Sequence, residues 1–233
     1  MRLRQGARGL SREAPPDPHI ARARLAARLG GARLYFITPD APPARVLELA
    51  EAAFAGGADV VQLRHKTLSR GELLALARRV RQVAVKGERL FVVNDHLDIA
   101  LLSEADGVHL GPDDITIESA RRVAGDRLLV GASASTPQDA TAAVNAGADY
   151  LGTGPAFETP IKTQKRVIGP GGVAAVVAAA GPAIPVFAIG GIDESNVGAL
   201  IAKGVRRVCV IRAIGDAADP ESAARRLRAM LDA

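Results

Sequence analysis

The stretch AGGADVVQLRHK, residues 55–66, contains a helix end, a tight turn and the start of a buried strand. Its two glycines suit a helix end, because glycine adopts the left-handed conformation found there at little cost. Val60, Val61 and Leu63 then form the apolar run typical of a strand buried on both faces. The pattern recurs as NAGADYL at 145–151 and AKGVRRV at 202–208, which indicates repeated strand–helix units.

Short apolar runs alternate with longer amphipathic segments along the whole chain. The predicted strands cover residues 33–38, 58–64, 89–94, 106–110, 128–133, 148–153, 185–190 and 206–211. Glycine ends several of the helices between them, at positions 57, 87, 125, 147, 181 and 204. Eight such units predict an α/β protein with a closed (β/α)8 TIM barrel over residues 31–233, and a doubly wound open sheet is the alternative.

Residues 1–30 form a basic extension before the predicted barrel. Residues 1–33 hold eight arginines against Glu13 and Asp17, whereas the rest of the chain carries 22 Lys and Arg against 23 Asp and Glu. The net charge of +5 therefore comes from the extension. We expect a solvated appendage with one helix near residues 19–29, whose deletion barely alters activity. An arm that contacts nucleic acid or an anionic surface is the alternative.

Composition excludes several classes of protein. Aromatic residues make up 3% of the chain, which argues against an aromatic platform for stacking nucleic-acid bases. The lone Cys209 excludes an intrachain disulfide and a multi-cysteine metal site. The sequence has neither a secretory signal nor an uncharged apolar run of membrane-spanning length. We expect a soluble cytoplasmic protein that binds small molecules and contacts neither nucleic acid nor a membrane. A homo-oligomer is possible.

Polar and charged side chains follow seven of the eight predicted strands. Barrels of this kind build their active sites at the C-terminal ends of the strands. The side chains are Gln62, Arg64 and Lys66, then Asn94 and Asp95, then His109, Asp113 and Asp114, then Ser133, the loop 154–166, Gly190 and Gly191, and Arg212. We interpret them as one site. Simple exposure to solvent would explain the polar side chains at any single strand end, but it explains all seven together less well.

Two carboxylates in this set, Asp95 and Asp114, predict a Mg²⁺ site. Mg²⁺ binds oxygen ligands, usually one or two carboxylates together with phosphate oxygens. Arg64, Lys66 and Lys162 supply cations that would neutralise the rest of a diphosphate. A general acid and base formed by the two aspartates is the competing interpretation.

A second anion site is predicted after the seventh and eighth strands. Gly190 and Gly191, with the backbone at Ile211 and Arg212, occupy the place where such barrels hold a phosphate. A tight turn would explain the two glycines equally well. Two phosphorylated substrates would indicate group transfer with diphosphate as the leaving group.

From about residue 33 to its end, the chain resembles the thiamin phosphate synthase family. The motifs are QLRHK at 62–66, VND at 93–95, GVHLGPDD at 107–114, GAS at 131–133, F-x-T-x-x-K at 157–162 and AIGGI at 188–192. The resemblance implies a Mg²⁺-dependent transferase of thiamine biosynthesis. It would join hydroxymethylpyrimidine diphosphate to a thiazole phosphate, through a dissociative path, and release thiamin phosphate and diphosphate.

The resemblance also assigns roles to individual residues. The pyrimidine diphosphate would be held by Gln62, Arg64, Lys66, Asn94, Ser133 and Lys162, of which Arg64, Lys66 and Lys162 would be catalytic. Mg²⁺ would be held by Asp95 and Asp114. The thiazole phosphate would be held by Thr159, Gly191 and the backbone at Ile211 and Arg212, and Ile161 would be a further substrate-binding position.

Three positions depart from the family pattern. His65 replaces a usual Glu, but it alternates away from Arg64 and Lys66 along a strand, so we expect the change to be tolerated. Ile161 replaces a usual Thr, which removes a hydroxyl contact. Arg212 replaces a usual Ser, and its guanidinium would either pair with the phosphate or obstruct the pocket.

Three other functions remain as alternatives. A thiazole tautomerase shares this barrel, and FET at 157–159 resembles its loop, but this chain has Pro155 where the tautomerase uses a His. A non-catalytic barrel that binds thiazole or thiamin phosphate is the second. A Schiff-base aldolase acting through Lys66 or Lys162 is the third, although neither lysine lies in an apolar segment that would lower its pKa.

Overall fold

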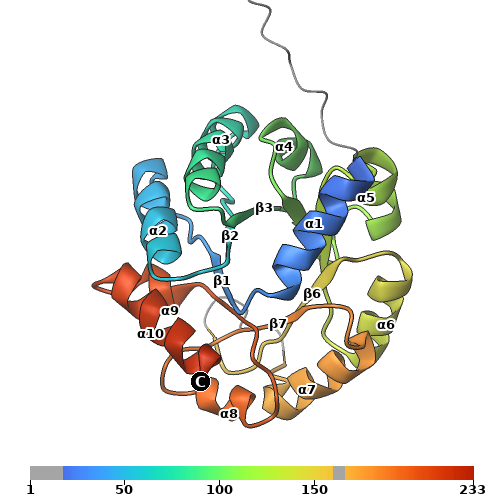
Figure 1. Ribbon diagram of the computed structural model, residues 1–233, viewed down its shortest axis with the longest axis vertical. Helices are drawn as coiled ribbons and strands as arrows, with labels where there is room; N and C mark the ends of the chain where they lie inside the picture. The colour runs from blue at the N-terminus through green and yellow to red at the C-terminus, as the bar shows by residue number, and fades with distance from the viewer. Residues whose placement is uncertain (1–17, 160–165) are drawn as a thin grey trace, which may run out of the picture.

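The computed structural model describes residues 18–159 and 166–233, and its strands form one closed parallel barrel (Figure 1). Each strand pairs with its sequence neighbours, and β8 pairs with β1 to close the ring. The strands are β1 (Leu34–Ile37), β2 (Val60–Leu63), β3 (Leu90–Asn94), β4 (Gly107–Leu110), β5 (Leu129–Ser133), β6 (Tyr150–Thr153), β7 (Val186–Ile189) and β8 (Val208–Val210). The predicted TIM barrel is confirmed, and the open sheet is wrong.

Helices follow the strands and form an outer ring around the barrel, except for α1, which precedes β1 (Figure 1). They are α1 (Pro18–Gly30), α2 (Pro43–Ala55), α3 (Arg70–Lys86), α4 (Leu97–Leu102), α5 (Ile117–Ala124), α6 (Pro137–Asn145), α7 (Gly169–Ala180), α8 (Val197–Ile201), α9 (Arg212–Gly215) and α10 (Pro220–Asp232). No helix among the described residues combines the length and apolar character needed to cross a bilayer.

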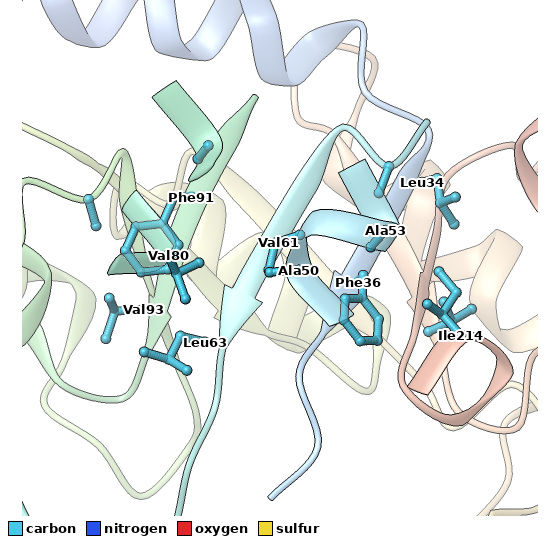
Figure 2. Packing of buried hydrophobic residues seen from close by; sticks show 14 of the residues in the cluster. Leu34, Phe36, Ala50, Ala53, Val61, Leu63, Val80, Phe91, Val93 and Ile214 are labelled. Carbon is cyan, nitrogen blue, oxygen red and sulfur yellow. The ribbon is translucent and has the colours of Figure 1, made fainter. Parts of the chain in front are cut away.

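One apolar layer lies between the barrel and the helix ring. Strand side chains alternate between the two faces, so every second residue points outward. Phe36, Val61 and Phe91 face outward and pack against Ala50 of α2 and Val80 of α3 (Figure 2). All five side chains are fully buried, so this layer supplies the greater part of the apolar burial that stabilises the fold.

A second apolar cluster fills the barrel, and α1 closes its lower end. The inward residues include Tyr35, Val60 and Phe187, and Leu29 of α1 packs against them with 1% exposure. Helix α1 lies across the end of the barrel at which the strands begin (Figure 1). The predicted helix in this region is therefore confirmed, but it packs on the barrel instead of standing free in solvent. The division of the chain at residue 30 stays a prediction.

Aspartates anchor the starts of three strand pairs at this lower end. Asp59, Asp106 and Asp149 precede β2, β4 and β6, and each accepts a backbone N–H from the preceding strand region, at 2.7–3.0 Å. Each also forms an ion pair with an arginine from a surrounding helix: Arg228, Arg81 and Arg121, respectively. Arg22 of α1 adds a second ion pair to Asp149, which fastens this helix to the barrel.

Glycine allows most of the tight helix ends predicted from the sequence. The glycines at 57, 125, 147, 181 and 204 have φ between +56° and +97°, in the left-handed region. Gly87 is an exception, because its φ is −89° and the next residue, Glu88, takes φ +53° instead. The prediction of a left-handed Gly87 is therefore wrong by one residue.

Candidate active site

The polar strand ends gather at the upper mouth of the barrel, opposite α1. Strands β2, β3 and β4 bring basic and acidic side chains there, and the loops after β6, β7 and β8 enclose a cavity of about 310 Å³. We call these two regions the charged half and the cavity half. Ser133 at the end of β5 lines the cavity from the boundary between them.

Asp95 and Asp114 lie within hydrogen-bond reach of each other in the charged half. Asp95 follows β3 with φ +63°, an uncommon conformation for a residue other than glycine, and its N–H bonds to His109 on β4 at 2.9 Å. Asp114 accepts the N–H of Gly111 at 2.7 Å. The two carboxylates predicted to share a site are thus brought together by neighbouring strands.

The pKa values of the two carboxyl groups shift in opposite directions. Burial opposes ionisation of Asp95, but hydrogen bonds from Lys66, whose Nζ lies 2.5 Å from Asp95 Oδ2, and with Asp114 outweigh it and lower the pKa. Burial raises the pKa of Asp114, and the Asp95 carboxylate raises it further against the opposing bond from Gly111. Two carboxylates this close repel each other, and a bound cation would relieve that repulsion.

The same pair fits a divalent cation that prefers oxygen ligands. No group of three or more His, Cys, Asp and Glu side chains with metal-binding geometry occurs within residues 18–159 and 166–233. Two carboxylates alone leave the remaining coordination positions to water or phosphate oxygens, which is the usual arrangement for Mg²⁺ and not for Zn²⁺.

Asp40, in the loop after β1, holds the basic segment in place and was not predicted from the sequence. Its Oδ2 accepts a hydrogen bond from Arg64 at 2.8 Å, and its Oδ1 accepts the Lys66 backbone N–H at 2.6 Å. His65 turns away and is buried, with Nε2 3.0 Å from the Ala41 carbonyl oxygen. The departure at His65 therefore places no side chain in the mouth, as expected.

Below the charged half, polar side chains continue into the barrel. Gln62 is buried, and its Nε2 donates to the Tyr35 hydroxyl at 3.1 Å. Asn94 ends β3 opposite His109, whose Nε2 lies 3.2 Å from Ser133 Oγ. The sequence interpretation placed Gln62, Asn94 and Ser133 in the site but did not include Tyr35.

Two glycines on inward strand positions make room for the rings below the mouth. A Cβ on Gly131 would come within 2.1 Å of the Tyr150 ring, and one on Gly152 within 3.2 Å of His109. The rings of His109 and Tyr150 lie side by side, with centroids 5.6 Å apart. These glycines and aromatic residues form the floor between the two halves.

The cavity half collects most of the residues predicted to hold the second phosphate. Thr159, Gly191, Ile211 and Arg212 all line the cavity. Arg212 shares this lining with two acidic residues, Asp193 and Asp216. Ile161 and Lys162 lie outside the described residues.

Close packing also explains the two glycines after β7. Gly190 and Gly191 have φ +102° and +64°, and a Cβ on either would collide with the loop after β6, at Pro155 and at Glu158. This contact alone requires glycine, so the phosphate role of Gly191 stays a prediction.

Comparison with known proteins shows which family carries this arrangement. The family model described as thiamine monophosphate synthase matches residues 34–214, most of the barrel. The chain belongs to the thiamine monophosphate synthase family. A thiamine-phosphate synthase of Anaeromyxobacter dehalogenans is 44% identical over 209 residues, which cover 89% of this chain and 90% of that relative. A thiamine phosphate pyrophosphorylase structure from Pyrococcus furiosus superposes with a TM-score of 0.80 at 36% identity, covering 88% of this chain and 98% of the other.

Some members of the thiamine monophosphate synthase family are much longer than this chain. The matched part of this chain spans 56% of the relative from Gloeobacter violaceus, at 44% identity. It spans 58% of the relative from Thermosynechococcus vestitus, at 45% identity. A more distant structure, a 3-hexulose-6-phosphate synthase, shares 21% identity with a TM-score of 0.69 and supports the fold alone.

Proposed function

We propose that this protein is a thiamine-phosphate synthase that couples a hydroxymethylpyrimidine diphosphate to a thiazole phosphate. The observation that carries the proposal is the meeting of the Asp95–Asp114 pair, Arg64 and Lys66 with a ligand-sized cavity at one barrel mouth. One half of the mouth suits a metal-bound diphosphate and the other suits a second, smaller anion. The family membership supports the same pair of substrates.

The charged half would bind and stabilise the leaving group. Asp95 and Asp114 would hold Mg²⁺, which supplies positive charge to the diphosphate oxygens when it is bound. Lys66 and Arg64 already lie at the mouth, held by Asp95 and Asp40, and they share their charge with the diphosphate. As the bond from the pyrimidine methylene carbon to diphosphate breaks, its electron pair leaves with the diphosphate, and these cations stabilise that growing charge.

The cavity half would position the nucleophile. Its residues hold the phosphate of the thiazole, with Arg212 as the charged contact and Thr159 and Gly191 beside it. The thiazole nitrogen then donates its lone pair to the methylene carbon and forms the new C–N bond. No protein base is required for this step, so catalysis rests on positioning of the two rings and on stabilisation of the leaving diphosphate. Lys162 is proposed as a further diphosphate contact on family resemblance alone.

A coupling assay with both substrates tests this proposal directly. The purified protein is incubated with the pyrimidine diphosphate and the thiazole phosphate, with and without Mg²⁺, and thiamin phosphate is measured. We expect product only when both substrates and the metal are present. Metal-independent isomerisation of a thiazole substrate alone would establish the tautomerase instead, and binding without any turnover would establish a non-catalytic barrel. Soluble fractionation of the native protein tests the proposed cytoplasmic location.

A further inference from the structure

Gln62 carries a buried amide oxygen that the protein leaves unsatisfied. The side chain is 1% exposed, and its Oε1 has no hydrogen-bond partner among the residues that the structure describes. Its Nε2, by contrast, is bonded to Tyr35. An unmade bond of this kind costs about 1–3 kcal/mol, so this oxygen calls for a partner from outside the protein, such as a ligand or a water molecule.

Two tyrosines stand behind this amide in a fixed arrangement. The Tyr35 hydroxyl oxygen lies 3.1 Å from Gln62 Nε2 and 3.2 Å from the Tyr150 hydroxyl oxygen. Both rings are buried, and Phe187 packs against them with centroids at 5.2 Å and 6.2 Å. The Tyr150 ring also fills the space beside Gly131, where other residues would have a Cβ. The β5 backbone therefore holds the Tyr150 hydroxyl in place.

The hydroxyl pair can decide which end of the Gln62 amide faces the substrate. A phenol has one proton to donate, together with lone pairs that accept. When Tyr35 donates its proton to Tyr150, it can only accept from Gln62, which turns the NH₂ group toward Tyr35. The amide oxygen is then the group left for a ligand.

Both hydroxyls keep their protons across the range in which the protein is assayed. Burial raises the pKa of Tyr35 well above its ordinary value, and the neighbouring Tyr150 adds to the shift. Burial likewise raises the pKa of Tyr150. The arrangement of donors and acceptors therefore does not change through ionisation of either ring.

We propose that Tyr35 and Tyr150 are positioning residues that fix Gln62 Oε1 as a hydrogen-bond acceptor, and so select a pyrimidine with an amino group over one with an oxo group. The proposal rests on the proposed function and deepens it by naming the feature of the substrate that is read. It also identifies a role for two residues that do not contact the reacting atoms.

Tyr→Phe variants test the proposal, because they remove one oxygen and leave the ring in place. Calorimetry measures binding of an aminopyrimidine diphosphate and of its oxo analogue, both with Mg²⁺, to the wild-type protein and to Y35F, Y150F and F187L. In Y150F, Tyr35 has its proton free for Gln62 Oε1, which reverses the amide. We expect the amino-over-oxo affinity ratio to fall about tenfold in Y150F, and the aminopyrimidine affinity to fall severalfold in Y35F.

F187L is the matched control, because it disturbs the packing of both tyrosines without removing a hydroxyl. It should lower the melting temperature and keep the wild-type affinity ratio. A ratio within threefold of wild type in Y150F, or an equal fall in F187L, would overturn the proposal. Because binding is measured without turnover, a wild-type protein that forms no thiamin phosphate would overturn the proposed function and leave this test intact.

Discussion

The two ends of the barrel use aspartate for opposite purposes. At the lower end, Asp59, Asp106 and Asp149 each accept a backbone N–H and pair with arginine, so their charge is neutralised within the protein. At the mouth, Asp95 and Asp114 face each other and share a single nearby lysine. Arginines neutralise the first group, whereas the two carboxylates of the second group repel each other and have one lysine between them.

This difference separates stability from chemistry along one axis. The ion pairs at the lower end stabilise the fold, whereas the proposed catalysis uses the charged groups at the mouth. Substitutions at the two ends should therefore change different quantities: the free energy of unfolding at one, and the rate of turnover at the other.

Deletion of residues 1–30 should produce the largest change at the lower end. It removes the apolar contacts of Leu25 and Leu29 and the Arg22 ion pairs, and we expect a loss of about 3–5 kcal/mol in the free energy of unfolding. Thermal unfolding measures this, with deletion of residues 1–17 as the control that keeps α1. Equal stability of the two deletions would show that α1 does not contribute, and would restore the expectation of a free appendage.

Substitution of Asp95 by Asn should have the largest effect on turnover. We expect kcat for thiamin phosphate formation to fall about a thousandfold, which is about 4 kcal/mol of transition-state stabilisation, because the metal site loses a charged ligand. The melting temperature should stay close to that of wild type. Asp98→Asn is the control, because Asp98 is exposed and paired only with Arg70 at 2.7 Å. Wild-type turnover in D95N would exclude Asp95 as a metal ligand.

Asp149→Asn should show the converse behaviour. Loss of the charge between Arg22 and Arg121 leaves two cations partly unpaired, and we expect about 2 kcal/mol of destabilisation. The kcat/KM of the folded protein should be unchanged at a temperature well below its unfolding. Asp126→Asn removes the more exposed partner of Arg22 and should cost less. A turnover defect in D149N would contradict the separation of the two ends.

Arg64→Ala should have the smallest of these effects. We expect KM for the pyrimidine diphosphate to rise and kcat to fall, with kcat/KM about tenfold lower, because Lys66 and the metal still neutralise the leaving group. Steady-state kinetics for each substrate separates these terms, with the exposed Arg45→Ala as the control. An unchanged kcat/KM would refute a catalytic role for Arg64 and assign it to the ion pair with Asp40.

The barrel could be predicted from the sequence, because its strands are short apolar runs and the helices before them end in glycine. Both signals are local in the sequence. The proximity of Asp95 and Asp114 could be predicted as well, because parallel strands bring their C-terminal ends to one place. Asp40 escaped prediction, since nothing in the TPDAPP loop shows that it folds back onto Arg64. Tyr35 and Tyr150 were not predicted to interact, because a buried hydroxyl pair depends on two strands that are distant in the sequence.

Composition misled the interpretation of the N-terminal segment in a similar way. Its arginines indicated a solvated arm, but Leu25 and Leu29 lie one helical turn apart and form the apolar stripe that contacts the barrel. Arg22 forms ion pairs with Asp126 and Asp149 of the barrel domain. The net charge of the segment gave no indication of these contacts.

The packed barrel interior and helix α1 leave the mouth as the one end at which a ligand can reach the polar strand ends. Leu29 and its neighbours cover the opposite end. In the proposed reaction, both substrates would therefore arrive and both products would leave through the mouth, and a product that stays bound would delay the next substrate.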